Sequence, residues 1–192
     1  MEQIRSFIAI ELPDELKLEL TRLQAKLKLG KQSSVKWVDP YAIHLTLKFL
    51  GNVAVDRVDT IIGAMQESVE GISPFDLEIN ELGVFPNLRR VQVVWVGMGG
   101  QIDRLRQLQQ NIESNLASLG FAPESRQFTP HLTLARVRER ASPDERQKFG
   151  QLITNTEFDA TYRFKVEAIS LMKSQLTREG AIYSRTSSVG LK

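Results

Sequence analysis

The sequence predicts an α+β protein with two similar lobes. Segments with the periodicity of strands and helices follow one another in the order strand, helix, strands, and then helix, strand, helix, strands. The tetrapeptide His-Leu-Thr-Leu occurs in each half, at 44–47 and at 131–134. Because no segment rich in Pro, Gly or Ser separates the halves, we expect one domain, 1–192, with lobes at approximately 1–98 and 99–192.

The first half begins with a predicted buried strand at 5–12, whose compact apolar run ends before Pro13. The stretch 13–29 places leucines three and four residues apart, with acidic residues early and lysines late. It therefore predicts an amphipathic helix, which Gly30 closes. The same reasoning predicts strands at 35–38, 43–50, 75–84 and 91–97, a helix at 56–69, and a hairpin through Pro86 and Asn87.

The second half begins with a predicted helix at 101–119, where apolar residues recur at helical spacing. The strand that contains the second tetrapeptide follows at 131–137. Ser142 and Pro143 are the residue types of an N-cap and a first helical position, so they predict a short helix that runs to Gly150. The remaining apolar segments predict strands at 158–173 and 181–184, separated by a turn at 177–180.

Composition narrows the class of protein without identifying a function. The chain is 42% hydrophobic and 25% charged, as globular proteins are, and it contains no secretion signal and no run of about 18 apolar residues. The absence of cysteine excludes disulfides and thiolate chemistry and suits a reducing compartment, so we expect a cytoplasmic protein that does not span a membrane. The net charge of +2 permits an anionic partner without requiring one. No long apolar helix is left unpaired, so we expect a monomer.

The repeated tetrapeptide contains both histidines of the chain. If each copy is a strand, alternation places His44 and Thr46 on one face and the two leucines on the other. His131 and Thr133 share a face in the same way. Each half therefore presents an imidazole beside a hydroxyl, and the duplication predicts that the two pairs act together.

Two imidazoles that face each other across a cleft can carry out concerted acid–base catalysis, because one can be neutral while the other is protonated near neutral pH. The threonine hydroxyls suit the oxygens of a tetrahedral anion, so phosphoryl chemistry fits the pattern best. Structural histidines and a metal site are the alternatives. A metal site usually needs a third ligand and a nearby acid, and neither tetrapeptide contains one, so we expect no metal and no cofactor.

With both motifs in place, the chain resembles the 2H phosphoesterase superfamily, which is defined by two H-x-[ST]-x motifs. It looks most like the RNA 2′,3′-cyclic phosphodiesterases, historically called 2′-5′ RNA ligases, and the resemblance covers nearly the whole chain. The matching stretches are R-S-F-I-A-I-E-L-P (5–13), V-K-W-V-D-P-Y-A-I-H-L-T-L-K-F-L-G (35–51), G-V-F-P-N-L-R-R-V-Q-V-V-W-V-G (83–97), R-Q-F-T-P-H-L-T-L-A-R (126–136) and I-S-L-M-K-S-Q-L-T-R-E-G-A-I-Y (169–183).

The resemblance implies a bilobal fold in which two pseudo-symmetric antiparallel β-sheets line a central groove, with helices on the outer faces. It also implies hydrolysis of a terminal RNA 2′,3′-cyclic phosphate, on RNAs such as tRNA fragments, to a 2′-phosphate without metal or cofactor. By this resemblance His131 is the proton acceptor for the attacking water, and His44 is the proton donor to the departing 3′-oxygen. Thr46 and Thr133 are implied to hold the phosphate oxygens.

The family's arginine, five residues after the second histidine, corresponds to Arg136 and is implied to bind phosphate. Simple alternation places Arg136 on the face of the motif's leucines, so a bulge, a twist or a strand end has to redirect it. The alternative is a solvated arginine. Further possible RNA contacts are Arg126 with a backbone phosphate, and Phe7 and Phe128 by stacking on a base, unless these aromatic rings belong to the core.

Other functions are compatible with parts of this pattern. Ligation of 2′-5′ RNA junctions would use the same two histidines in the reverse direction. A non-catalytic RNA- or nucleotide-binding module would keep the groove, although it would have no chemical need for both histidines and both threonines. A different cyclic phosphate substrate is the remaining alternative.

Overall fold

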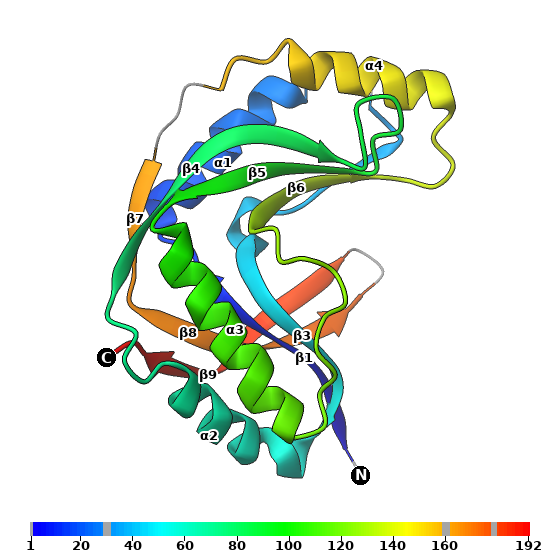
Figure 1. Ribbon diagram of the computed structural model, residues 1–192. Coiled ribbons are helices and arrows are strands. Elements are labelled where there is room, and N and C mark those ends of the chain that lie inside the picture. Colours follow the sequence, from blue (N-terminus) through cyan, green and yellow to red (C-terminus); the bar gives the residue numbers. More distant parts are fainter. Residues whose placement is uncertain (1, 29–31, 159–161, 178–179) are drawn as a thin grey trace.

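The computed structural model contains two antiparallel sheets that face each other, and helices cover their outer sides (Figure 1). The predicted fold class is thereby confirmed. The structure describes residues 2–28, 32–158, 162–177 and 180–192. The predicted helix end at Gly30 and the two central residues of the predicted turn at 177–180 lie outside the described residues.

The first sheet has four strands in the order β3-β1-β8-β9, and each neighbouring pair is antiparallel. Its apolar centre is the run from Phe7 to Ile10, which is buried as the sequence predicts. The strands are β1 (Gln3–Glu11), β3 (His44–Ala54), β8 (Ala168–Leu176) and β9 (Ala181–Gly190).

The second sheet has five strands in the order β2-β6-β5-β4-β7, and its neighbours are antiparallel as well. The predicted hairpin through Pro86 and Asn87 joins β4 to β5. The strands are β2 (Val35–Trp37), β4 (Phe75–Phe85), β5 (Val93–Gly100), β6 (His131–Val137) and β7 (Tyr162–Val166).

Each sheet carries two α-helices on its outer side (Figure 1). One pair packs together over the first sheet, and the other pair covers the second sheet. The first pair is α2 (Val58–Ser68) and α3 (Ile102–Ser118), and the second is α1 (Asp14–Leu27) and α4 (Pro143–Thr154). Two short 3-10 helices, η1 (Pro40–Ala42) and η2 (Val55–Arg57), flank β3.

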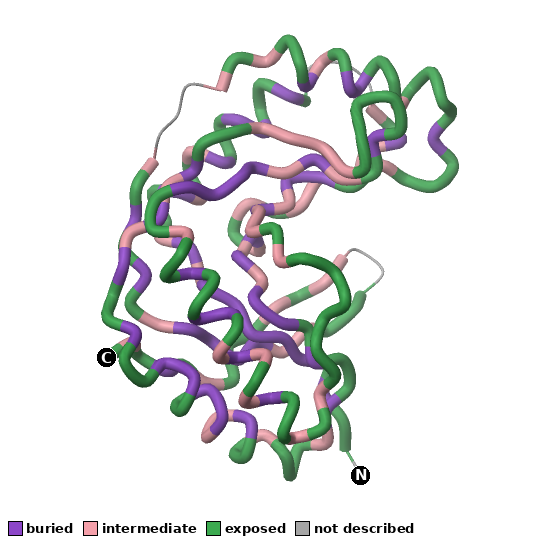
Figure 2. The backbone as a smooth tube through the Cα atoms, in the orientation of Figure 1, coloured by how far each residue is buried: buried purple, intermediate pink, exposed green. Residues whose placement is uncertain are grey.

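Most buried apolar side chains form one cluster, and Phe7, Ala9 and Met172 form a small second one. Figure 2 shows where the buried residues lie along the backbone. Leu16 and Leu20 of α1 belong to the large cluster and are fully buried, as their spacing predicts. The predicted start of α4 is also confirmed, because Ser142 and Glu145 form a capping box. Among the described residues, no helix is long and apolar enough to cross a membrane.

The two sheets do not follow the predicted lobe boundary between 1–98 and 99–192. Strands β8 and β9 of the second half extend the sheet that contains β1 and β3, while β4 and β5 of the first half pair in the other sheet. The chain passes between the sheets through α1, through η1 and through α2, and again at Glu167, the single residue between β7 and β8. Periodicity identifies strands but not their partners, so this exchange was not predictable from it.

The last predicted strands differ most from the observed ones. The segment 158–173 contains two strands of different sheets, and β9 continues beyond the predicted 181–184 to Gly190. The extension of β9 is rich in Ser and Thr and lies at the sheet edge. Its strand conformation follows from antiparallel pairing with β8, which an apolar pattern does not report.

Candidate active site

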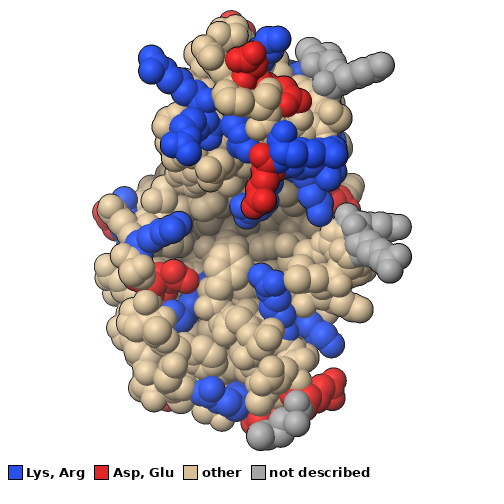
Figure 3. Space-filling view, turned by 90° about the vertical axis from the view of Figure 1, so that its right-hand side faces the viewer, with Lys and Arg blue, Asp and Glu red and all other residues tan. Residues whose placement is uncertain are grey.

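A cavity of about 210 Å³ lies between the two sheets and is lined by both copies of the tetrapeptide. His44 and Thr46 reach it from β3, and His131 and Thr133 reach it from β6. Arg136 lines the same cavity. Figure 3 shows the hollow between the lobes, with Lys and Arg side chains around its rim. The structure therefore brings together the five residues that the motifs single out.

The two motif strands fold alike. In both strands, the first six residues have the same sequence of exposure: the histidine and the threonine are half-buried, and the leucines and the fourth residue after the histidine are buried. The residue five positions after the histidine is exposed in both strands; it is Phe49 in β3 and Arg136 in β6. The duplication predicted from the tetrapeptide thus extends to the local burial of the backbone.

A β-bulge in each motif strand explains why Arg136 faces the cavity. Between β5 and β6, Trp95 pairs with Thr133 and Val94 pairs with Ala135, so Leu134 is an extra residue on β6. One extra residue reverses the alternation of side chains and turns Arg136 onto the face of Thr133. Arg136 is the residue for which simple alternation gave the wrong face.

The same device acts in β3. Between β1 and β3, Ala9 pairs with Thr46 and Ile8 pairs with Lys48, so Leu47 is the extra residue. Lys48 is therefore buried against the helices, where its Nζ contacts Glu113 Oε2 at 2.6 Å. Phe49 turns into the cavity instead. Phe49 and Arg136 are thus structural counterparts, one aromatic and one cationic.

A buried glutamine of α1 stabilises the bulge of β6. The carbonyl oxygen of Leu134 accepts hydrogen bonds from the Val38 N–H at 2.9 Å and from Gln24 Nε2 at 3.1 Å. Gln24 Nε2 also donates to the Val38 carbonyl at 2.7 Å, and the side chain is fully buried. The polar groups that the bulge frees from the ladder are satisfied in this way, which holds Arg136 in its orientation.

Both imidazoles are oriented by the same local hydrogen bond. Nδ1 of His44 lies 2.9 Å from the Ala42 carbonyl oxygen, and Nδ1 of His131 lies 2.7 Å from the Thr129 carbonyl oxygen. A carbonyl oxygen only accepts, so Nδ1 carries the proton in each ring. Nε2 is then the atom with which each neutral imidazole can accept a proton, or each imidazolium can donate one.

His44 lies in an aromatic niche on the first sheet. The Phe7 ring stacks on it with centroids 4.5 Å apart, and the Tyr183 ring meets it edge-on at 4.9 Å. Burial lowers the pKa of the His44 imidazole, and this effect exceeds the opposing effects of the Ala42 hydrogen bond and the Glu11 carboxylate. Phe7 is only 2% exposed, so it supports the imidazole, and its predicted stacking on a base does not fit this position.

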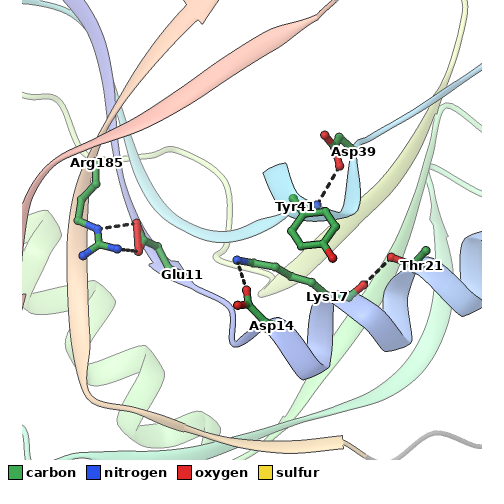
Figure 4. A network of polar contacts seen from close by, with 7 residues as sticks. All are labelled: Glu11, Asp14, Lys17, Thr21, Asp39, Tyr41 and Arg185. Carbon is green, nitrogen blue, oxygen red and sulfur yellow. Dashed lines mark hydrogen bonds and ion pairs between the residues drawn. The ribbon is translucent and has the colours of Figure 1, made fainter.

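A charged pair lies beside this niche. Glu11 is the partner of His44 in the register of β1 and β3. Its carboxylate binds Arg185 of β9 through two contacts, Nε to Oε1 at 3.1 Å and Nη2 to Oε2 at 2.9 Å (Figure 4). His44 and Arg185 both line a further cavity of about 480 Å³, and Lys17 and Tyr41 line it as well. The carboxylate nearest to His44 is thus partly neutralised by an arginine.

His131 has different neighbours on the second sheet. The Phe85 ring meets it edge-on with centroids 5.1 Å apart, and the Trp95 ring lies at 6.3 Å. No ring is stacked on the imidazole among the described residues. The aromatic surroundings of His131 thus differ from those of His44.

Two predicted contacts lie away from the cavity. Phe128 packs against the apolar core, and neither Phe128 nor Arg126 lines the cavity. Phe128 therefore packs with the core, which was the alternative to stacking on a base, because neighbouring apolar side chains cover a ring that precedes the motif strand. In the described parts of the chain, no three His, Asp or Glu side chains form a group that could hold a metal ion. The absence of a metal from the reaction stays a prediction.

Sequence reasoning missed several residues of the site. Phe49 could have been found, because it stands as far from His44 as Arg136 stands from His131. Tyr183 comes from a strand 139 residues away in sequence (183 minus 44), and no local pattern connects it with His44. Glu11 and Gln24 act through strand register and helix packing, which depend on the folded structure.

Comparisons with known proteins identify the family of the chain. A family model described as the 2′-5′ RNA ligase superfamily matches residues 12–178. The chain is 34% identical over 182 residues to an RNA 2′,3′-cyclic phosphodiesterase of Methanothermobacter thermautotrophicus, covering 95% of this chain and 96% of that protein. It is 36% identical over 149 residues to a protein of the same name from Aeropyrum pernix, covering 78% and 82%. The crystal structure of E. coli LigT complexed with 3′-AMP has a TM-score of 0.78 at 26% identity and covers 99% of both chains.

Proposed function

The chain belongs to the 2′-5′ RNA ligase superfamily, and from this premise we propose that it is an RNA 2′,3′-cyclic phosphodiesterase. The reaction is hydrolysis of a terminal 2′,3′-cyclic phosphate to a 2′-phosphomonoester and a free 3′-hydroxyl. The observation that carries the proposal is the convergence of two His-Thr pairs, one from each sheet, on one cavity. The names of relatives that match over most of their length support the same activity.

The two Nε2 atoms supply the proton transfers. His131 Nε2 takes a proton from water while the water oxygen forms a bond to phosphorus. The bond between phosphorus and the 3′-oxygen breaks, and His44 Nε2 gives its proton to that oxygen. One water molecule is consumed, and the imidazoles end with exchanged protonation states, so proton exchange with solvent restores the starting state.

The remaining residues of the cavity stabilise and orient the phosphate. The Thr46 and Thr133 hydroxyls donate to its non-bridging oxygens, and the Arg136 guanidinium adds a fixed positive charge where negative charge develops. Phe49 offers an exposed aromatic face from β3, and its ring centroid is 6.1 Å from that of Phe7. We assign it to stacking on the terminal base, a role that does not suit Phe7, which is buried, or Phe128, which packs against the core outside the cavity.

The ionisation of His44 follows from its surroundings. Burial lowers its pKa, so the free protein favours the neutral imidazole. A bound phosphate anion favours the imidazolium by direct attraction, and the Glu11 carboxylate acts in the same sense. Substrate binding therefore supplies the charge that keeps the proton donor protonated.

We propose a cytoplasmic monomer that acts on RNA ends such as those of tRNA fragments. The lack of cysteine supports a reducing compartment. Light scattering tests the oligomeric state, and a single species of about 22 kDa is the expected result.

The function is tested by incubating the protein in EDTA with an RNA oligonucleotide that ends in a 2′,3′-cyclic phosphate. Phosphorus NMR is expected to show a 2′-phosphomonoester. A 3′-phosphate product would reverse the assignment of the leaving oxygen, and no turnover by folded protein would favour the binding module. A second reaction with added 5′-hydroxyl RNA measures ligation, which would appear as a longer product resistant to phosphatase.

A further inference from the structure

A second cavity of about 400 Å³ continues the groove beyond Arg136. Arg136 and Tyr183 line both this cavity and the one that holds the histidines, so the two cavities adjoin. Lys36 lines only the second cavity. Thr177 and Gly180, at the ends of β8 and β9, form its opposite side. The cavity is thus a continuation of the proposed active site along the edge of the second sheet.

Lys36 and Arg136 are direct partners in the antiparallel register of β2 and β6. Side chains in such positions stand on the same face with their Cβ atoms about 4.5–5.5 Å apart, and like charges there are destabilising. Both side chains are exposed, and within the described part of the chain neither has a carboxylate within ion-pairing distance. Among the described residues, the sheet therefore holds two adjacent cations that no carboxylate pairs with.

A second cross-strand cation of the same sheet shows the usual arrangement. Arg163 of β7 stands opposite Glu78 of β4 and forms an ion pair with it at 3.2 Å. The described lining of the second cavity contains one acidic residue, Asp39. Its carboxylate accepts a hydrogen bond from the Tyr41 N–H and does not pair with Lys36 or Arg136. An anion that binds between Lys36 and Arg136 would relieve their repulsion.

The proposed function needs cations at two phosphates, and the cavity that holds the histidines has Arg5 and Arg136 in its lining. Arg136 faces the reacting phosphate, whereas Lys36 faces only the neighbouring space. We propose that Lys36, next to Arg136, binds the internucleotide phosphate that precedes the terminal cyclic phosphate, an inference that rests on the proposed function. The preferred substrate is then an oligonucleotide rather than a cyclic mononucleotide. Because Lys36 reads a phosphate, this preference does not depend on base sequence.

The test compares two substrates that differ in this phosphate, a nucleoside 2′,3′-cyclic monophosphate and a dinucleotide that ends in a 2′,3′-cyclic phosphate. The measured quantity is the ratio of kcat/KM for the dinucleotide to kcat/KM for the mononucleotide. We expect Lys36→Gln to lower this ratio about three- to tenfold, the effect of one exposed charge contact. The salt dependence of log kcat/KM for the dinucleotide is expected to become shallower by about 0.7, the contribution of one phosphate in a single strand.

Lys165→Gln is the matched control, because Lys165 is an exposed lysine of the same sheet that lines neither cavity. It is expected to keep the wild-type ratio, and Lys36→Arg is expected to restore most of it. An unchanged ratio in Lys36→Gln, or equal losses for both substrates, would overturn the subsite and leave the proposed hydrolysis standing. Wild-type protein that hydrolyses neither substrate would overturn both.

Discussion

His44 and His131 occupy the same position in two strands with the same burial pattern, yet their surroundings differ. His44 is stacked on Phe7 and meets Tyr183 edge-on, whereas the Phe85 and Trp95 rings both meet His131 edge-on. The hydrogen bond from Nδ1 to the carbonyl two residues earlier is the same for both. The backbone frame is duplicated, and the aromatic neighbours of the two rings are not.

This difference bears on how one repeated motif can supply two roles. A symmetric pair of imidazoles would have equal affinity for a proton, and neither ring would be favoured as donor or acceptor. Burial lowers the pKa of His44, and the charges of Glu11 and of a bound phosphate act in the opposite direction. The protonation of His44 is therefore tied to occupancy of the groove.

Removing either imidazole is expected to have the largest effect. His44→Ala and His131→Ala should each lower kcat about 10²- to 10⁴-fold on an RNA with a cyclic phosphate end, the usual contribution of one general acid or base. Rate assays measure the turnover of each variant, and circular dichroism shows whether the variant is folded. Near wild-type kcat in either folded variant would remove that histidine from the mechanism.

The two residues at the matching bulges are expected to separate charge from stacking. Arg136→Gln should lower kcat about 10- to 100-fold, because it removes charge from the reacting phosphate. Phe49→Ala should instead raise KM about 5- to 150-fold with a small change in kcat, since base stacking contributes about 1–3 kcal/mol in single-strand binding. Equal effects of both substitutions on kcat would contradict the different roles given to these counterparts.

These bulges also mark the limit of what the sequence could predict. Leucine spacing, helix caps and the two tetrapeptides identify most elements and the four central side chains, because they depend on local periodicity. The extra residues Leu47 and Leu134 look like ordinary core leucines in the sequence, so the faces of Phe49 and Arg136 could not be read from alternation. The exchange of strands between the sheets depends on long-range pairing and was equally invisible.

The bulge of β6 can be disturbed from a distance. Gln24→Leu removes the donor that serves the Val38 and Leu134 carbonyls, and a buried acceptor left unsatisfied costs about 1–3 kcal/mol. Urea unfolding should show a loss of stability of that size, and kcat should fall in the folded variant because Arg136 is no longer held. If kcat is unchanged while stability falls, Gln24 supports the fold alone. If Gln24 instead acts through Arg136, the Gln24→Leu substitution made in an Arg136→Gln background should add no further loss of kcat.

The smallest expected effect concerns the charges beside His44. Glu11→Gln removes a negative charge that favours the imidazolium, so the pKa of His44 should fall further. Arg185→Gln removes the cation that neutralises Glu11, so the pKa should rise. Proton NMR resolves both, because the chain has only two histidines. Shifts of the same sign in both variants would exclude this electrostatic account.

The central claim, that both imidazoles converge on one phosphate, is tested most directly by NMR titration with a dinucleotide that carries the 2′-phosphate of the product. The imidazole C2–H signals of His44 and His131 are assigned from the two alanine variants. Both signals are expected to shift along the titration with one common dissociation constant. A shift confined to one imidazole, or two unrelated dissociation constants, would contradict the account.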